Sequence, residues 1–159
     1  MARYRPPSSP KSPYITRQGY ETLQREQRGL WQTRREVVVH LAAAAAEGDR
    51  SENAEYIYRK KELRGIDRRI GYLQRRIPVL RIVADPPSDP ERIFFGAWVE
   101  LEGESGERET FRIVGADELD PARGWISMDS PMARALMKKT RDDEVQVQTP
   151  KGTAQYWIL

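Results

Sequence analysis

Residues 41–56 read Leu41-Ala-Ala-Ala-Ala-Ala-Glu47-Gly-Asp49-Arg-Ser-Glu52-Asn-Ala-Glu55-Tyr56, and this stretch decides the fold. The alanine run favours a helix, and Gly48 is expected to end that helix. Only residues 47–51 separate it from the apolar pattern that follows. A connection this short forces the two flanking helices to pack antiparallel. The sequence therefore predicts a helical hairpin with its turn at these residues.

Apolar positions on both sides of the turn follow helical spacing. The first helix is predicted to begin near Arg17 with Thr16 as its cap, and the second near Ser51 or Glu52. The first stripe is Tyr20, Leu23, Leu30, Val37, Leu41 and Ala44. The second stripe is Tyr56, Leu63, Ile66, Ile70, Leu73, Ile77 and Leu80. From Leu63 onward its steps alternate between three and four residues, which is the heptad seam of a coiled coil.

Three residues interrupt the second helix without an explanation in the sequence itself. Gly65 and Gly71 lie inside the stripe, and each is expected to cost about 1 kcal/mol relative to alanine. Pro78 is expected to kink the last turn.

Four carboxylates crowd the hairpin turn, at Glu47, Asp49, Glu52 and Glu55. One interpretation is structural, because Asp-x-x-Glu at a helix start forms a capping box and the helix dipole favours acidic residues there. The other interpretation is a weak divalent-cation site, because carboxylate oxygens suit Mg²⁺, which takes one or two protein carboxylates and keeps its waters. Such a site would matter most when the tip completes a site in another molecule.

Charge divides the chain into a basic and an acidic part. Residues 50–83 carry ten Lys or Arg and four Asp or Glu, a net +6, whereas residues 93–159 carry eight and twelve, a net −4. This asymmetry predicts two modules with different partners, the basic one suited to a phosphate backbone. Solvated helix cations are the alternative explanation.

The chain has no cysteine, which excludes disulfides and thiolate metal sites and suits a cytoplasmic location.

The remaining boundaries follow from composition. Residues 1–13 are predicted to be a disordered basic tail, residues 14–83 the hairpin, residues 84–92 a proline-rich linker and residues 93–159 a second domain. No apolar run is long enough to cross a membrane. Five strands are predicted in the second domain, at residues 94–101, 109–114, 125–128, 144–148 and 153–158. Ser130 and Pro131 are expected to start a helix over residues 132–139. Strands with one helix make an α+β domain.

Several separate blocks of the sequence resemble the bacterial transcript cleavage factors of the GreA/GreB family. They are Glu47-Gly-Asp-Arg-Ser-Glu-Asn-Ala-Glu-Tyr56, Lys60-Lys61, Leu63-Arg64, Ile66-Asp-Arg-Arg69, Phe94-Phe-Gly-Ala-Trp-Val99, Phe111-Arg-Ile-Val-Gly115 and Ile126-Ser-Met-Asp-Ser-Pro-Met-Ala-Arg-Ala-Leu136. The match runs in order from about Tyr14 to the end. It is closer to GreB, because of Asp49-Arg50-Ser51 and the basic second helix.

The resemblance implies both a fold and an activity. The fold is an antiparallel coiled-coil hairpin followed by a small FKBP-like α+β domain. The hairpin enters the secondary channel of a backtracked RNA polymerase and stimulates the polymerase's own cleavage of the nascent RNA near its 3′ end. The factor is then no enzyme by itself and acts as a monomer. Asp49 and Glu52 match the residues that help to hold a Mg²⁺ shared with the polymerase, and Glu47, Asn53 and Glu55 are neighbouring candidates for a helping role.

Two further groups of residues match the family by position. Lys60, Lys61 and Arg64 match a basic patch that contacts the extruded RNA, and Arg68 and Arg69 extend it. Asp129, Ser130, Pro131 and Met132 match the loop that docks on the coiled coil at the rim of the channel. Ser130 and Pro131 are also expected simply to start a helix.

The sequence also departs from the family. Asp142 replaces a usual glycine, and the chain ends several residues early, so the last strand is expected to be shortened. Phe94, Phe95, Trp98, Trp125 and Trp157 are expected to fill the core of the second domain. Three other functions stay open: a channel-binding regulator without cleavage activity, a plain RNA-binding hairpin, and prolyl isomerisation, for which no pocket is evident and which fold alone does not establish.

Overall fold

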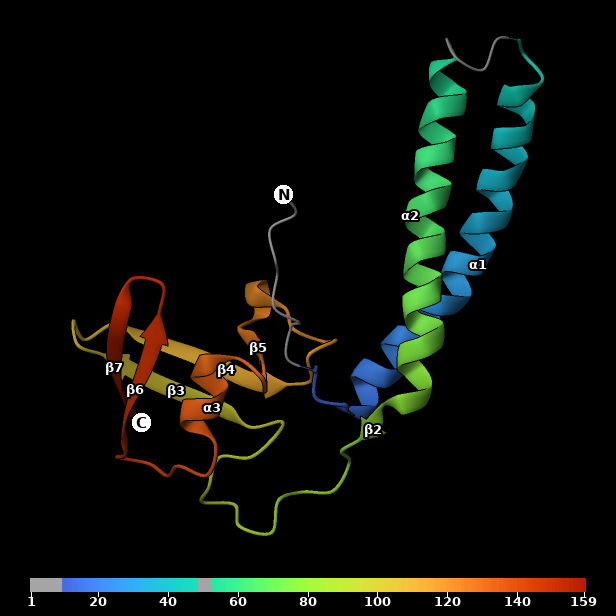
Figure 1. The fold of residues 1–159 in the computed structure, drawn as a ribbon. Coiled ribbons are helices and arrows are strands. Elements are labelled where there is room, and N and C mark those ends of the chain that lie inside the picture. The colour runs from blue at the N-terminus through green and yellow to red at the C-terminus, as the bar shows by residue number, and fades with distance from the viewer. Residues whose placement is uncertain (1–9, 49–52) are drawn as a thin grey trace. The chain divides into compact units, whose positions relative to one another are not determined.

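The computed structural model describes residues 10–48 and 53–159 and divides the chain into two compact units. One unit contains Tyr20–Leu80. The other contains Met1–Gly19 together with Arg81–Leu159. The predicted fold class is confirmed, because a long helical pair precedes a mixed β-sheet with one α-helix (Figure 1).

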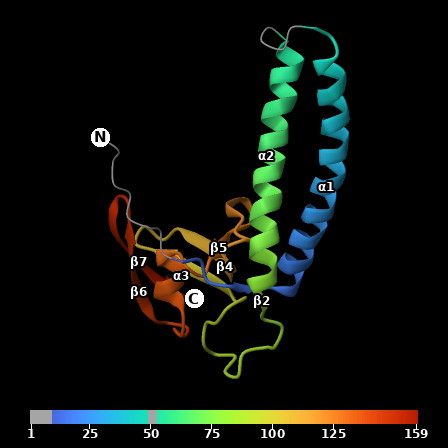
Figure 2. The same ribbon diagram turned by 45° about the vertical axis from the view of Figure 1, so that its right-hand side comes forward.

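Helices α1 (Arg17–Ala45) and α2 (Ala54–Arg76) form the hairpin and lie side by side (Figures 1 and 2). Thr16 caps α1 as predicted, because its hydroxyl accepts a hydrogen bond from Gly19 N at 3.0 Å. The buried seam residues are Val37, Ile66 and Ile70, with Leu30 and Leu63 packed against them. Ion pairs cross between the helices from Arg34 to Asp67 at 2.6 Å and from Arg69 to Glu26 at 2.7 Å.

Both ends of α2 differ from the sequence-based expectation. The helix begins at Ala54 and not at Ser51 or Glu52, because Asn53 holds the N-cap position and accepts a hydrogen bond from Tyr56 N. It ends at Arg76, where a 3₁₀ turn, η1 (Ile77–Val79), takes over. Pro78 lies in that turn, as expected of a residue that cannot donate a hydrogen bond to the preceding helical turn.

A five-stranded sheet forms the second unit, in the order β5-β4-β3-β7-β6. Its strands are β3 (Trp98–Gly103), β4 (Arg108–Val114), β5 (Trp125–Ser127), β6 (Glu144–Thr149) and β7 (Gly152–Ile158). The β4–β5 pair is parallel and the other pairs are antiparallel. Strand β7 is paired on both sides, with six residue pairs to β6 and three to β3.

Helix α3 (Pro131–Leu136) closes the core of this unit. Ala133 and Leu136 are fully buried there with sheet residues Val99, Leu101 and Ile113. Ser130 caps the helix by accepting a hydrogen bond from Ala133 N, and Pro131 begins it, as predicted. The helix ends at Leu136 rather than residue 139, because the backbone turns away at Met137 and Lys138 has a positive φ of 67°.

The chain enters and leaves the hairpin at one place. Strand β1 (Tyr14–Ile15) pairs in parallel with β2 (Arg81–Ile82). The Glu118 carboxylate then accepts hydrogen bonds from Thr16 N at 2.9 Å, from the Thr16 hydroxyl and from Gly115 N at 2.8 Å. The segment before α1 is therefore bound into the same unit as the sheet.

The expectation that the large aromatic residues fill the core is wrong. Trp98 is 58% exposed and Trp157 is 38% exposed, while Phe94, Phe95 and Trp125 are half-buried. Successive side chains of a strand point to opposite faces of the sheet. Val99 and Ile158 point into the core, so the adjacent Trp98 and Trp157 point outward. The Arg112 guanidinium lies 6.0 Å from the Trp98 ring centroid and 5.1 Å from that of Trp125. These rings thus form cation–π contacts across the strands.

The first predicted strand of this domain begins too early. Residues 94–97 form a turn, with Ala97 N donating to Phe94 O at 3.1 Å, and the strand starts only at Trp98. Gly96 has a φ of 86° in this turn, which a β-strand does not allow.

Two glycines of α1 are expected to respond oppositely to substitution by alanine. Gly29 faces open space, so Gly29→Ala should raise stability by about 1 kcal/mol through helix propensity. A Cβ at Gly19 would lie 2.2 Å from the Glu118 carboxylate, which cannot move without breaking its hydrogen bonds. We expect Gly19→Ala to lower stability by about 1–3 kcal/mol. Urea unfolding followed by circular dichroism checks both, and equal stabilisation by the two substitutions would contradict the close contact.

Asp142, which replaces a usual glycine of the family, adopts the left-handed conformation that glycine favours, with a φ of 67°. Its turn is held by Asp142 N donating to Ile158 O, and by Asp143, whose carboxylate accepts from Thr140 N at 2.8 Å. That hydrogen bond lowers the pKa of Asp143.

We expect Asp142→Gly to raise the melting temperature, since it removes about 1 kcal/mol of left-handed strain. Asp142→Val should lower it, and the reverse order would contradict this account.

Within residues 10–48 and 53–159, no helix combines the length and the apolar character that a membrane span requires.

Candidate functional site

The predicted catalytic residues Asp49 and Glu52 lie outside the described residues, but the helix ends on either side of them are well defined. Asn53 Nδ2 donates to Ala44 O at 2.7 Å, while Asn53 Oδ1 accepts from Tyr56 N at 3.1 Å. One side chain thus joins the end of α1 to the start of α2. Asparagine is a preferred N-cap residue, a signal that the sequence analysis assigned to neighbouring residues instead.

The other two carboxylates of the turn have distinct surroundings. Glu47 is exposed. Glu55 forms an ion pair with Arg59 at 3.0 Å, and Arg59 also lies 3.4 Å from Glu62. The hydrogen bond that Arg59 Nε donates to the Glu55 carboxylate raises the pKa of Arg59. Glu55 therefore belongs to a helix-face ion-pair network. Among the described residues, no group of three or more His, Cys, Asp or Glu side chains is arranged to hold a metal ion.

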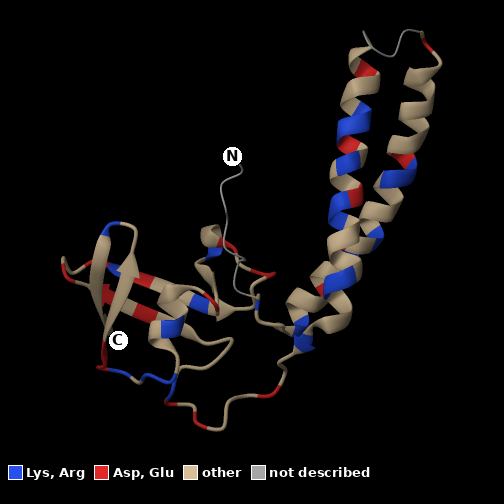
Figure 3. Cartoon of the chain, in the orientation of Figure 1, with Lys and Arg blue, Asp and Glu red and all other residues tan. Residues whose placement is uncertain are grey.

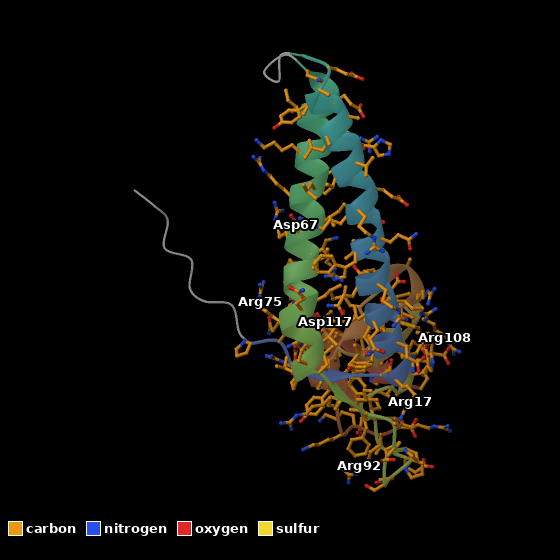
Figure 4. The ribbon with its side chains drawn as sticks, turned by 90° about the vertical axis from the view of Figure 1, so that its right-hand side faces the viewer. Arg17, Asp67, Arg75, Arg92, Arg108 and Asp117 are labelled. Atoms are coloured by element: carbon orange, nitrogen blue, oxygen red, sulfur yellow. The ribbon has the colours of Figure 1, made fainter. Side chains whose placement is uncertain are left out.

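The predicted RNA-binding residues lie on one exposed face of α2. Lys60, Lys61 and Arg64 are all exposed, and Arg64 lies four positions from Lys60 and three from Lys61, which places it beside both on the helix surface. Arg68 and Arg75, both exposed, continue the face along the helix. Figure 3 shows Lys and Arg along α2, and Figure 4 labels Arg75. At 100° per residue, this face lies opposite the seam that contains Ile66, Ile70 and Leu73. The result is a row of cations directed away from α1.

Arg69 does not continue that row. It forms two hydrogen bonds with Glu26 of α1, at 2.7 and 3.0 Å. Its charge is largely balanced by this pair, so it has a structural role in the hairpin.

The predicted docking residues are contiguous, but they have different tasks in the fold. Asp129 accepts hydrogen bonds from Ser12 N at 2.9 Å and from the Ser12 hydroxyl. Ser130 caps α3, Pro131 is exposed, and Met132 packs on the core. Beside this loop lies a mainly apolar cavity of about 360 Å³. Its lining includes Phe94, Phe95, Met128 and Met137.

A hairpin with a basic outer face and a turn rich in carboxylates, followed by this α+β unit, agrees with the family models that match the chain. Residues 13–82 match the model described as "Transcription elongation factor, N-terminal". Residues 87–159 match the model described as "Transcription elongation factor, GreA/GreB, C-term". The chain therefore belongs to the GreA/GreB family of transcription elongation factors, which implies interaction with RNA polymerase.

Individual relatives agree with the family models. The chain is 58% identical to the transcription elongation factor GreB of Yersinia pestis over 150 residues, covering 94% of this chain and 88% of the relative. It is 56% identical to GreB of Xanthomonas axonopodis pv. citri, covering 100% of this chain and 96% of the relative. A crystal structure of Thermus aquaticus Gfh1 is 25% identical with a TM-score of 0.44, covering 94% and 97% of the chains. The predicted nearness to GreB is confirmed by the two GreB relatives.

Proposed function

We propose that this factor stimulates the cleavage of backtracked nascent RNA by RNA polymerase. The hairpin enters the secondary channel, and Asp49 and Glu52 complete a site that the polymerase's own carboxylates begin. The factor is not a nuclease by itself, because it supplies only part of this site. It acts in the cytoplasm as a monomer.

The observation that supports this proposal most strongly is the N-cap of α2. Asn53 already provides the side-chain cap of that helix by accepting a hydrogen bond from Tyr56 N, so this contact does not require Asp49 or Glu52 as a capping box. Placing two acidic residues beside Glu47 in one short turn brings like charges together, which is unfavourable. A cation shared with another molecule would offset that cost.

The chemistry expected at the tip is two-metal phosphodiester hydrolysis. Carboxylate oxygens are suitable ligands for Mg²⁺, and a second Mg²⁺ at such a site stabilises charge on the attacking or leaving oxygen. Asp49 would hold the Mg²⁺ together with the polymerase, and Glu52 would help to position the metal or the attacking water.

The rest of the chain orients the tip. Lys60, Lys61 and Arg64 attract the phosphates of the extruded RNA, since cations along the arm neutralise its charge. The loop of Asp129, Ser130, Pro131 and Met132 docks on the coiled coil at the channel rim. The apolar cavity beside that loop provides surface for such a contact.

Cleavage of end-labelled RNA in a stalled, backtracked complex tests the proposal. We expect rapid shortening of the RNA only when the factor, Mg²⁺ and cognate polymerase are all present. The factor incubated with RNA alone should leave it intact and bind it weakly. If the factor binds the complex and no RNA is cut, it is a regulator that occupies the channel. Tight, salt-sensitive binding to free RNA would instead indicate an RNA-binding hairpin.

A further inference from the structure

A shallow groove crosses the middle of the hairpin, and neither the catalytic tip nor the docking loop accounts for it. It has a volume of about 510 Å³, within the range of about 300–1,000 Å³ found for small-molecule sites. It is lined by Leu30 of α1 and by Tyr58, Lys61, Gly65 and Ile66 of α2, together with the ion-paired Glu62 and Arg69. All of these residues belong to the same unit.

Gly65 opens this groove. Residues 58, 61, 65 and 69 follow one another at helical spacing along α2, so their side chains would form one row. At Gly65 the row has a gap, because a Cβ placed there would meet nothing within 4 Å. Glycine weakens a helix interior by about 1 kcal/mol relative to alanine. The open surface gives this glycine a role that the sequence did not explain.

The chemistry of the lining suits a flat, charged ligand. Leu30 and Ile66 supply apolar surface, and the Tyr58 ring is 59% exposed beside them. Glu62 pairs with Arg59, and Arg69 pairs with Glu26. Lys61 is exposed and has no ion pair among the described residues. The Arg59 guanidinium lies 5.5 Å from the centroid of the Tyr58 ring, so a base would stack on the part of this exposed ring that Arg59 leaves open. The groove thus combines an exposed aromatic ring with Lys61, a cation that is in no ion pair among the described residues.

We propose that this groove binds one nucleobase of the extruded RNA, with the base stacked on Tyr58 and the adjoining phosphate held by Lys61. The inference rests on the proposed function, because RNA reaches the hairpin only inside the channel. Single-stranded RNA is generally held by stacking on aromatic side chains. The neighbouring face of Lys60, Arg64 and Arg68 supplies charge complementarity for the strand on either side. Stacking accepts any base, which suits a factor that acts on transcripts of any sequence.

The affinity of the full-length factor for two polymerase complexes tests this site. One complex carries a backtracked RNA with an extruded 3′ segment, and the other carries none. All variants are made in the Asp49→Ala background, so that the RNA stays intact during the measurement. We expect the parent protein to bind the backtracked complex more tightly. Tyr58→Ala should reduce that preference about tenfold, the order expected for loss of one base stack, and Tyr58→Phe should retain it.

Two further variants separate the groove from the stability of the hairpin. Gly65→Leu fills the gap with a better helix former, so loss of the preference in this variant cannot come from unfolding. Trp31→Ala removes an exposed aromatic ring outside the groove and should leave the preference intact.

The outcomes also distinguish this site from the proposed function. Equal weakening of both complexes by Tyr58→Ala would show that a polymerase side chain occupies the groove and would overturn the proposal. No change in either complex would overturn it too. A preference for extruded RNA that depends on Tyr58, in a factor whose wild type stimulates no cleavage, would support the groove and reject the cleavage function.

Discussion

Replacing Asp49 by alanine is expected to abolish stimulated RNA cleavage while leaving the binding of the factor to polymerase unchanged. The carboxylate is proposed to contact the shared Mg²⁺, and loss of one electrostatic contact to a transition state lowers a rate by about 10²–10³-fold. Glu52→Ala should act in the same direction with a smaller effect, because its role is to position the metal or the water. Single-turnover cleavage at saturating factor measures both rates.

The charge-neutral variant Asp49→Asn and the neighbouring Glu55→Ala sharpen this test. Asparagine keeps the size of the side chain but removes its charge, so it should be nearly as defective as alanine. Glu55 is already paired with Arg59, and its removal should cost little cleavage activity. If the Asp49→Ala factor stimulates cleavage at the wild-type rate, Asp49 does not contribute to the shared site and the acidic turn has only a structural role.

Replacing Glu118 by alanine is expected to have the largest effect on stability. Thr16 N, the Thr16 hydroxyl and Gly115 N would all lose their acceptor, and both residues are buried. An unsatisfied buried donor costs about 1–3 kcal/mol. We therefore expect a loss of about 3 kcal/mol, roughly a hundredfold in the folding equilibrium.

Urea unfolding followed by tryptophan fluorescence measures this loss, because three of the four tryptophans lie in the unit that contains Glu118. Glu104 is exposed in the turn between β3 and β4, so Glu104→Ala is a matched control expected to change stability by less than about 0.5 kcal/mol. A Glu118→Ala protein as stable as this control would show that the junction is held by the β1–β2 pairing alone.

The hairpin was predictable because its signals are local. Thr16 at the cap, the alternating apolar steps and the short turn each constrain neighbouring residues, and all of them agree. The α3 cap at Ser130 was predictable for the same reason. The start of α2 was misplaced because the acidic pattern of Asp49 and Glu52 indicates an earlier helix start, although asparagine is a preferred N-cap residue and Asn53 accepts the capping hydrogen bond from Tyr56 N.

The errors in the second unit have both local and distant causes. Val99 and Leu101 alternate with Glu100 and Glu102, a local pattern that places Trp98 on the outer face of its strand, whereas the contact of its ring with Arg112 of the next strand is not visible in the sequence. Glu118 was not identified at all, since its partner Thr16 lies 102 residues away. The groove was likewise hidden, because an interior glycine reveals open surface only when the neighbouring helix is placed.

The pairing of β1 with β2 has a consequence for folding during synthesis. Residues 20–80 make their contacts within one hairpin and can fold as soon as they leave the ribosome, since local contacts form fast. Tyr14 and Ile15 are synthesised earlier but can pair only after Arg81 and Ile82 have been made. Ser12 can form its hydrogen bond only after Asp129 has been made, 117 residues later. We expect hydrogen-exchange labelling of nascent chains to show α1 and α2 protected while the amides of residues 14–16 still exchange. The segment that is synthesised first would then fold after the hairpin that follows it in the chain.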